Sequence, residues 1–213
     1  WFNNWETCLV PTSPWRSCMS IPRSLSLRRV AFNHEEPATY VLVQQPVIEL
    51  NQLAAASRNL DTSAAGWPPV AVTAPDDLKD MTFQLTATLR PGTARSVGFR
   101  IRTGDDEFTE VAWDRDFTAV YVDRSQSGNV AFHPTFAGRH HAPTRLIDGE
   151  ITLQMIVDRS TIEVFINGGE SVISDRIFPS THQPVIEVFA GDKTASIPSA
   201  QLQQLRSVRK QQQ

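Results

Sequence analysis

Two copies of the tetrapeptide Val-Asp-Arg-Ser, at positions 122–125 and 157–160, are the first residues whose types could do chemistry. A carboxyl group held beside a guanidinium and a hydroxyl could serve in acid–base catalysis. Each copy, however, stands at the end of a run of alternating apolar residues, which is typical of the end of a strand. An Asp there can accept hydrogen bonds from turn N–H groups and pair with a cation on a neighbouring strand. We therefore predict that both copies are structural.

Three histidines, His133, His140 and His141, lie in the polar segment 128–143. A zinc site needs a complete ligand set at fixed geometry, which this segment does not predict. The acidic run 105–107 lacks the ligand periodicity of a calcium-binding EF-hand loop. We therefore expect a loop around the histidines, a solvated turn at the acidic run, no metal site and no cofactor.

Two cysteines, Cys8 and Cys18, lie ten positions apart across a segment that contains proline. If the flanking residues pair as a hairpin, the two thiols are close enough in sequence to form a disulfide. The alternative, two small buried side chains in adjacent strands, stays open at this point.

The elements that position these residues are strands. Apolar residues alternate with polar ones over residues 81–89, 97–102 and 151–158, and again over 162–166. Asn167-Gly168-Gly169 then predicts a hairpin turn, because these residue types tolerate positive φ. Many short strands and no apolar stripe at helical spacing predict an all-β fold, an antiparallel two-sheet β-sandwich.

The order of three motifs closely resembles the C-terminal β-sandwich of glycoside hydrolase family 32, the β-fructofuranosidases (invertases, inulinases and levanases). The motifs are Val-Asp-Arg-Ser at 157–160, Ile-Glu-Val-Phe-Ile-Asn-Gly-Gly-Glu at 162–170 and Asp-Arg-Ile-Phe-Pro at 175–179. The N-terminal residues 1–6, 11–17 and 19–23 are similar to the last blade of that family's five-bladed catalytic propeller.

The resemblance implies a division of the chain into three parts. Residues 1–46 are expected to be the last strands of a β-propeller blade, and residues 76–213 the β-sandwich. Residues 47–75 are expected to be a linker, in which the Ala and Leu residues of 49–56 favour a short helix.

The same resemblance implies that no catalytic residue lies in this chain. Retaining glycosidases place two carboxyl groups about 5 Å apart across the scissile bond. The family carries its carboxylates in a Trp-Met-Asn-Asp-Pro-Asn-Gly-like motif, in Arg-Asp-Pro and in Glu-Cys, and none of these occurs here. Arg115-Asp116-Phe117 and Glu6-Thr7-Cys8 depart from the motifs and receive no role. We predict that the chain alone does not hydrolyse sugars.

Two tryptophans are the candidate substrate-binding residues. The resemblance places Trp1 where the family keeps an aromatic residue at the propeller pocket, with Trp5 close behind. An indole can stack on a furanose ring while its N–H finds a hydroxyl group. The alternative for both, core packing between blades, stays open.

The resemblance implies the C-terminal part of a retaining β-fructofuranosidase-type hydrolase acting on sucrose or on fructans such as inulin or levan. Its sandwich would support an upstream catalytic propeller, from the same precursor or a separate chain. A stand-alone carbohydrate-binding, lectin-like module is the alternative, because fold does not settle function. It would use exposed aromatic residues, for which Trp67, Trp113 and Tyr121 are candidates. A purely structural fragment that associates through its sheet edges is a third reading.

Composition bears on the partners. The net charge of the 213 residues is only -3 and the 20 Lys and Arg residues are scattered, which argues against a nucleic-acid partner. No apolar run approaches the roughly 20 residues that cross a bilayer, so we expect no membrane partner. The chain starts at Trp1 without a signal-peptide pattern, at what we expect to be a processing boundary. Secretion is implied by the resemblance only, and a homodimer stays open.

Overall fold

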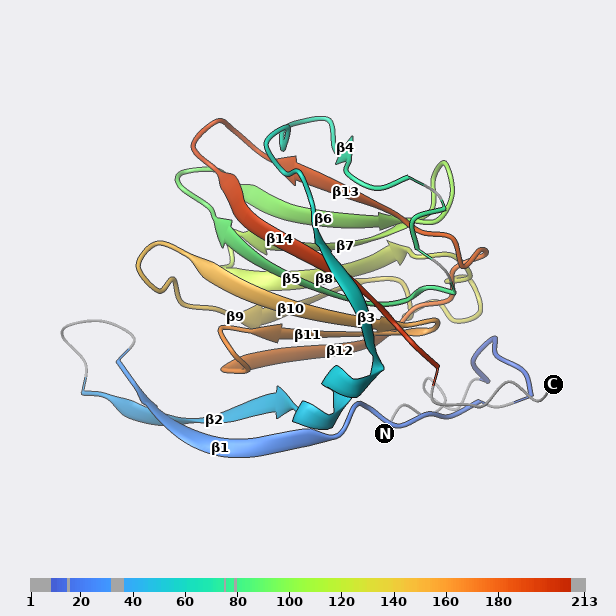
Figure 1. Cartoon of the computed structure of the whole chain (residues 1–213), viewed down its shortest axis with the longest axis horizontal. Helices are drawn as coiled ribbons and strands as arrows, with labels where there is room; N and C mark the ends of the chain where they lie inside the picture. The colour runs from blue at the N-terminus through green and yellow to red at the C-terminus, as the bar shows by residue number, and fades with distance from the viewer. Residues whose placement is uncertain (1–8, 15, 32–36, 75, 79, 208–213) are drawn as a thin grey trace.

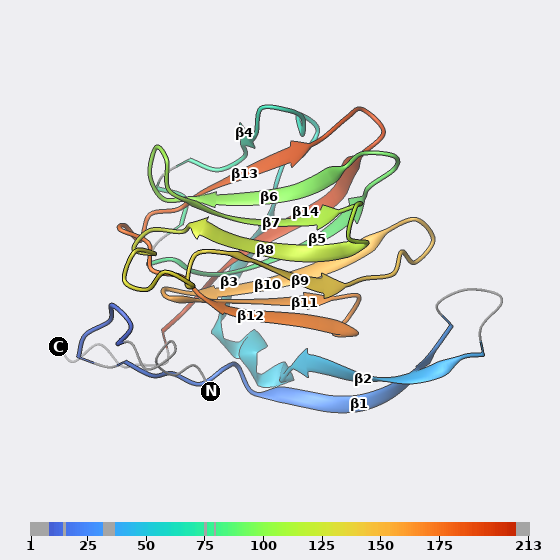
Figure 2. The same cartoon turned by 180° about the vertical axis from the view of Figure 1, so that it is seen from behind.

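The computed structural model describes residues 9–14, 16–31, 37–74, 76–78 and 80–207. These residues form two six-stranded antiparallel sheets and one separate two-stranded sheet, shown in Figure 1 and from behind in Figure 2. Sheet I has the order β12 (Ser171–Arg176), β11 (Thr161–Ile166), β10 (Ile151–Asp158), β5 (Thr82–Arg90), β14 (Ser196–Leu205) and β3 (Ala54–Asn59). Sheet II has the order β4 (Val70–Ala71), β13 (Val185–Ala190), β6 (Ser96–Arg102), β7 (Phe108–Asp114), β8 (Ala119–Gln126) and β9 (Arg139–Pro143).

The core lies between the two sheets. On β5, the inward residues Phe83, Leu85 and Leu89 are fully buried, and Phe99 on β6 faces them with no exposed surface. The polar residues between them point away from the core, which is the alternation that the sequence showed. Burying one such side chain stabilises the fold by about 1.5–3 kcal/mol. The predicted all-β sandwich is confirmed.

One segment differs from its prediction. The short helix expected at 49–56 is a 3-10 helix, η1 (Ile48–Leu53), and the alanines that follow it begin β3. β3 pairs with β14, with Gln201 opposite Asn59, so it belongs to sheet I. Strands of the sandwich therefore already occur inside the segment 47–75 that was expected to be a linker. Within the described part of the chain, no helix has the length and apolar character needed to cross a membrane.

The two-stranded sheet is a hairpin of β1 (Arg23–Val30) and β2 (Thr39–Pro46). Its antiparallel register places Leu27 opposite Leu42. The hairpin lies along the β12 edge of the sandwich in both views, and η1 leads from it to β3 (Figures 1 and 2). It is the part of the chain for which the sequence predicts the end of a propeller blade.

Candidate functional site

The β1–β2 hairpin contacts sheet I at the turn between β11 and β12. The turn residues Asn167, Gly168 and Gly169 all have positive φ, as the Asn-Gly-Gly sequence predicts. The N–H of Gln44 on β2 donates to the carbonyl oxygen of Gly169 at 3.0 Å. A Cβ on Gly169 would lie 1.9 Å from the carbonyl oxygen of Gln44. Only glycine lets strand β2 approach the turn this closely.

The next residue of the turn, Glu170, is the centre of an ion cluster. Arg28 of β1 donates to its Oε1 at 3.1 Å and also to the carbonyl oxygen of Asn167 at 3.1 Å. Arg145 donates to both carboxylate oxygens at 2.8 Å. Burial raises the pKa of Glu170, but the hydrogen bonds from Arg145 and Arg28 outweigh this and hold it below its usual value. The carboxylate therefore joins the hairpin to the sandwich.

A second carboxylate, Glu163 on the outer face of β11, also joins the hairpin to the sandwich, near the start of β1. Its side chain is 2% exposed, and Oε2 lies 2.5 Å from Nη2 of Arg23. The N–H of Ile21 donates to Oε1 at 2.7 Å, and the hydroxyl of Ser174 donates to Oε2 at 3.3 Å. The guanidinium of Arg23 also lies 5.2 Å from the centre of the Phe165 ring. A buried carboxylate is thus compensated by the N-terminal segment.

An apolar cluster closes this end of the outer face of sheet I. Ile156 and Phe165 point outward from β10 and β11 and are nevertheless buried, together with Leu205 of β14. They are covered by side chains from the N-terminal segment, from η1 and the start of β3, and from β12, namely Ile21, Leu50, Leu53, Ala54 and Val172. We call the residues that receive the hairpin, Arg145, Glu163, Gly169, Glu170 and Ser174, the hairpin-docking surface.

The hairpin carries an apolar face that no described residue covers. Leu25 and Leu27 of β1 are 63% and 70% exposed, and Tyr40 and Leu42 of β2 are 67% and 51% exposed. Their register places all four on one face of the two-stranded sheet. Large exposed apolar patches are typical of surfaces that bind another protein, a membrane or a ligand.

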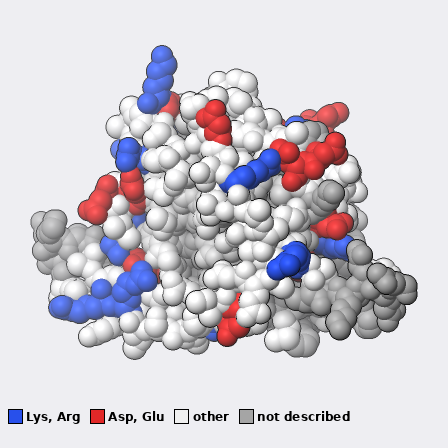
Figure 3. Space-filling model, viewed as in Figure 1, with Lys and Arg blue, Asp and Glu red and all other residues white. Residues whose placement is uncertain are grey.

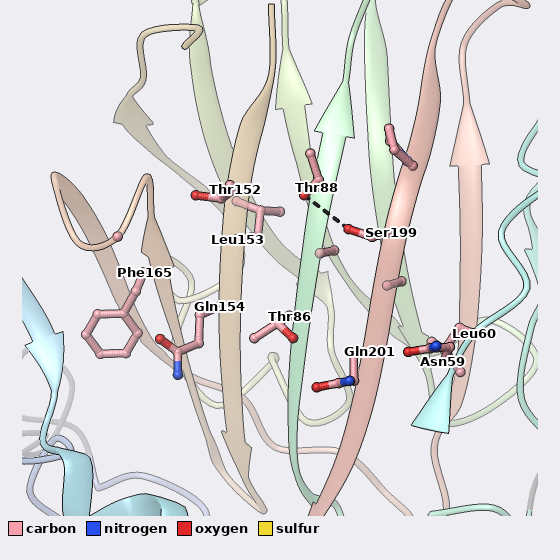
Figure 4. Close-up of a pocket in the computed structure, with 14 residues that line it drawn as sticks. Asn59, Leu60, Thr86, Thr88, Thr152, Leu153, Gln154, Phe165, Ser199 and Gln201 are labelled. Atoms are coloured by element: carbon pink, nitrogen blue, oxygen red, sulfur yellow. Dashed lines mark hydrogen bonds between the residues drawn. The ribbon is translucent and has the colours of Figure 1, made fainter. Parts of the chain in front are cut away.

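The remaining outer face of sheet I is an open groove with a volume of about 610 Å³. Figure 4 shows polar side chains of β10, β5 and β14 standing along it, among them Thr152, Gln154, Thr86 and Gln201, with Asn59 of β3 at its far side. Gln154 is two positions from the buried Ile156 on β10, so the groove begins where the apolar cluster ends. We call it the neutral groove.

The outer face of sheet II is richer in charge, but its charged groups are paired with each other. Arg100 lies 2.7 Å from Glu110, which accepts a hydrogen bond from the hydroxyl of Tyr121. Burial and the neighbouring Glu110 raise the pKa of Tyr121. Arg139 stacks 4.0 Å from the centre of the Tyr121 ring and bonds to Asp123 at 3.0 Å. The charged groups of this network therefore have their partners within the network.

The first tetrapeptide has the structural role that the sequence predicts. Asp123 accepts the N–H of Ser125 at 2.9 Å and bonds Arg139 on the neighbouring strand. Arg124 is 1% exposed and reaches from β8 to Asp175 on β12 at 3.2 Å, so it links the two sheets. In the second copy, the carbonyl oxygen of Ser160 accepts from the Arg176 guanidinium at 3.1 Å.

The histidines are placed differently from the prediction. His133 lies in a loop, as expected, but His140 and His141 lie on β9 rather than in the loop. His140 Nδ1 is 2.8 Å from Asp175 Oδ1, so its partner is a carboxylate of the other sheet. The described residues contain no group of three or more His, Cys, Asp or Glu side chains that could hold a metal ion.

The predicted site residues at the start of the chain fall largely outside the described residues. Trp1, Trp5 and Cys8 lie there, so the sugar contacts and the disulfide stay predictions. The side chain of Cys18 is half-buried, and burial raises the pKa of its thiol while the positive charge of Arg176 opposes the rise.

The hairpin-docking residues were missed from the sequence. Glu163 stands between Ile162 and Val164, so the alternating pattern places its charge on the opposite face from the core residues. Glu170 directly follows the predicted turn. Both positions indicate a carboxylate that must be paired with a cation. The cations, Arg23 and Arg28, are about 140 residues earlier in the chain. Pairing over that distance cannot be read from spacing.

Of the three aromatic residues that a lectin-like site would use, two are buried. Trp113 is 4% exposed and Tyr121 is 2% exposed, whereas Trp67 is 65% exposed. A ring stacks on a sugar only through an exposed face. These three residues therefore do not form the exposed platform that the stand-alone module would need.

Comparison with known sequences gives consistent matches. A sequence model for the C-terminal domain of glycosyl hydrolases of family 32 matches residues 48–204. The chain is 37% identical over 215 residues to the levanase of Bacillus subtilis (strain 168), a match that covers 98% of this chain and 30% of the levanase. It is 32% identical over 188 residues to the extracellular exo-inulinase of Aspergillus ficuum, covering 84% of this chain and 33% of that protein.

Solved structures agree on the fold. The exo-inulinase of Aspergillus awamori superposes with a TM-score of 0.76 at 28% identity, over 93% of this chain and 38% of the exo-inulinase chain. A fructofuranosidase of Schwanniomyces occidentalis has the same TM-score of 0.76 at 19% identity, over 93% of this chain and 42% of that chain, which shows the fold alone. The chain spans about a third of the length of the two curated relatives named above.

Proposed function

The chain belongs to glycosyl hydrolase family 32, whose C-terminal domain it contains, and on that premise we propose that it is the C-terminal part of a retaining β-fructofuranosidase. The substrate class that we propose is sucrose or a fructan such as inulin or levan. The relatives named levanase and exo-inulinase support this choice. The sandwich then serves as the support of an upstream catalytic propeller.

The observation that carries this proposal is the attachment of the β1–β2 hairpin to sheet I. Glu163 and Glu170 each bind an arginine of β1, and Gly169 admits the backbone of β2. A two-stranded sheet is at best marginally stable by itself in water. The hairpin is therefore held by the sandwich on one side while its apolar face remains open on the other.

We propose that the open face of the hairpin packs against earlier strands of the propeller. Leu25, Leu27, Tyr40 and Leu42 offer an apolar surface to such strands. The hairpin then fixes the orientation of the whole propeller relative to the sandwich, because its other contacts are short, charged and directional. Residues 1–46 are, in this proposal, the last strands of the last blade.

The chemistry of hydrolysis lies upstream in this proposal. A retaining glycosidase uses one carboxylate as nucleophile and one carboxyl group as acid and base. The motifs that hold them in the family are not in this sequence. We propose that Trp1 and Trp5 contribute indole faces to the sugar pocket of the propeller. This chain supplies binding surface and support rather than the reacting groups.

The test is the release of fructose from sucrose, inulin and levan. The 213-residue chain, with its intact mass verified, is expected to release none. The same chain joined to the upstream propeller is expected to release fructose. Release by the chain alone would overturn the assignment of the catalytic carboxylates to the upstream part.

Two further parts of the proposal concern location and assembly. The relatives include exo-inulinases named as extracellular, which supports secretion of the protein to which this chain belongs. A homodimer would cover further exposed surface. Measuring the mass of the joined protein in solution over a range of concentrations tests this, and a single mass equal to one copy would exclude the dimer.

A further inference from the structure

The neutral groove on the outer face of sheet I is lined by fourteen residues, none of which is Asp, Glu, Lys, Arg or His. Figure 3 views the same face and shows a broad area without Lys, Arg, Asp or Glu over β10, β5 and β14, with charged groups around it. An anionic ligand such as a nucleic acid or a phosphate is bound through cationic groups. The groove offers none, so its chemistry suits an uncharged ligand.

The polar side chains of the groove form two rows across the strands. In the first row, Thr152 of β10 pairs with Thr88 of β5, which pairs with Ser199 of β14. In the second row, Gln154 pairs with Thr86, Thr86 with Gln201, and Gln201 with Asn59. Three strand spacings give the second row a length of about 14 Å. A length of this order favours an extended ligand over a single sugar.

Much of the hydrogen-bonding capacity of these rows is unused. The Ser199 hydroxyl donates to Thr88 at 3.1 Å (Figure 4), and the amide of Gln154 donates to Gln84 at 3.1 Å. Among the described residues, the side-chain polar atoms of Thr86, Thr152 and Gln201 make no hydrogen bond to protein, although the backbone N–H of Thr152 donates to Asn167. Hydroxyl and amide groups each donate and accept, which matches the hydroxyl groups of a carbohydrate.

A protein partner fits this groove poorly. Protein interfaces have an apolar and often aromatic centre. The apolar lining residues Leu60, Ala87, Leu153 and Ala200 are buried in the sandwich, and Phe165 is only 1% exposed. The exposed large apolar side chains of the described residues all lie elsewhere, as on the β1–β2 hairpin.

We propose that the neutral groove binds a fructan chain, with the two polar rows hydrogen-bonding successive sugar hydroxyls. The choice of fructan among neutral oligosaccharides rests on the proposed function. The groove has no exposed aromatic platform, so each sugar is held by hydrogen bonds alone and the binding is weak per residue. Such a site raises the local concentration of a polymer that is also held elsewhere on the same protein.

The test is a titration of the isotopically labelled 213-residue chain with inulin-type and levan-type fructo-oligosaccharides, followed by NMR. The side-chain amide signals of Asn59, Gln154 and Gln201 are expected to shift, while that of Gln126 on sheet II stays in place. A cello-oligosaccharide of the same length is expected to cause no such shifts. The absence of shifts with fructans, or equal shifts with the cello-oligosaccharide, would overturn the proposal.

A pair of matched variants locates the site. The double variant Thr86→Val with Gln201→Leu removes a hydroxyl and an amide of the second row, and is expected to bind at least about tenfold more weakly. The control, Thr82→Val with Gln126→Leu, makes the same changes outside the lining and is expected to bind like the original. The single variant Thr152→Val gives an independent result in the first row. Unchanged affinity in both groove variants would overturn the proposal.

These outcomes are separate from those of the proposed function. Fructose release on joining the upstream propeller depends on the docking of the hairpin and not on the groove. If fructose release is restored but the NMR signals do not shift, the groove proposal is wrong and the proposed function is supported. If the chain binds fructans but fructose release is never restored, the proposed function is wrong and the groove proposal is supported.

Discussion

At one end of the outer face of sheet I, the carboxylate of Glu163 is 2% exposed and lies 2.5 Å from Arg23. At the other end of the same face, Thr86 and Gln201 stand in an open groove without side-chain partners among the described residues. The boundary between the two surfaces lies on β10, between Ile156 of the apolar cluster and Gln154 of the neutral groove. The sheet thus carries, side by side, one surface whose buried carboxylates are paired with cations and another whose polar side chains are largely unpaired.

This difference separates two uses of polar groups. Buried groups with complete partners fix one part of the molecule to another, and removing one partner is costly because the other is left desolvated. Exposed groups without partners contribute little to stability and are free to bind a ligand. Substitutions in the hairpin-docking surface should therefore unfold the chain or detach the hairpin. Substitutions in the neutral groove should only weaken the binding of a ligand.

The largest effect is expected from Gly169→Ala on the hairpin-docking surface. The new Cβ would overlap the backbone of Gln44, and the residue would have to hold a φ of 90°. Overlap and backbone strain each cost about 1–3 kcal/mol and act together, so we expect a loss of up to about 6 kcal/mol or detachment of the hairpin. Urea unfolding and tryptic cleavage in β1 measure the two results.

Gly149→Ala is the matched control, since Gly149 has a φ of 80° but no atom within 4 Å of an added Cβ. It should show the cost of strain alone. If the two alanine variants lose the same stability, close approach of β2 to the turn is not what Gly169 provides.

The next effect is expected from Arg23→Met, which leaves Glu163 buried without its cation. Removing one member of a buried ion pair costs about 3–5 kcal/mol. Arg95→Met is the control, because Arg95 and its partner Asp116 are 81% and 53% exposed and such pairs contribute about 0–1 kcal/mol. Adding Glu163→Gln to Arg23→Met should recover part of the loss in a double-mutant cycle. No recovery would mean that the charge of Glu163 is not the cause.

A smaller effect is expected from acid. The pKa of Glu170 is held below its usual value of about 4.5 by the paired arginines, despite burial. A carboxyl group with a lowered pKa in the folded state stabilises that state above its unfolded pKa, and this contribution is lost as the pH falls through the folded pKa. Protection of β1 from an acid-active protease should therefore decrease below about pH 4.5.

Glu170→Gln should make that protection less dependent on pH. Asp61→Asn is the control, because the pKa of Asp61 is lowered by hydrogen bonds from Ser63 and Asp61 does not contact the hairpin. An unchanged pH profile in Glu170→Gln would exclude this carboxylate as the acid-sensitive link.

The smallest effect on stability is expected in the neutral groove. Thr86→Val with Gln201→Leu removes groups that have no partner to leave behind, so each change should alter stability by no more than about 0.5 kcal/mol. The measurement is the urea midpoint at constant slope. A loss of several kcal/mol would show that the groove groups are structural, and would remove the contrast between the two ends.

The parts of the fold that alternate in sequence could be predicted. β5 carries an unbroken alternation of apolar and polar residues, β10 and β11 carry one that only Ile156 and Phe165 interrupt, and the Asn-Gly-Gly turn joins β11 to β12. β3 could not be predicted, because its Ala-rich sequence favours a helix weakly and its pairing with β14 overrides that preference. β9, with its two histidines, has no apolar alternation because it is an edge strand of sheet II.

The candidate site was less accessible to prediction than the fold. The motif around Gly169 identified the family, but its contact with β2 depends on a residue 125 positions earlier in the chain. The residues that line the neutral groove come from five strands that are far apart in sequence but neighbours in sheet I, namely β11, β10, β5, β14 and β3. Period-2 alternation tells which residues face outward, but not which outward residues meet across strands.

Because Arg23 and Glu163 are far apart in the sequence, the ribosome synthesises them at clearly different times. These residues are 140 positions apart, and β14, which completes sheet I, comes later still. At translation rates of about 5–20 residues per second, the acidic partner emerges from the ribosome about 7–30 s after the arginine. Throughout that interval the β1–β2 hairpin has no sandwich to dock against, and since a two-stranded sheet is at best marginally stable by itself in water, the hairpin gains this support only once the last third of the chain has been made.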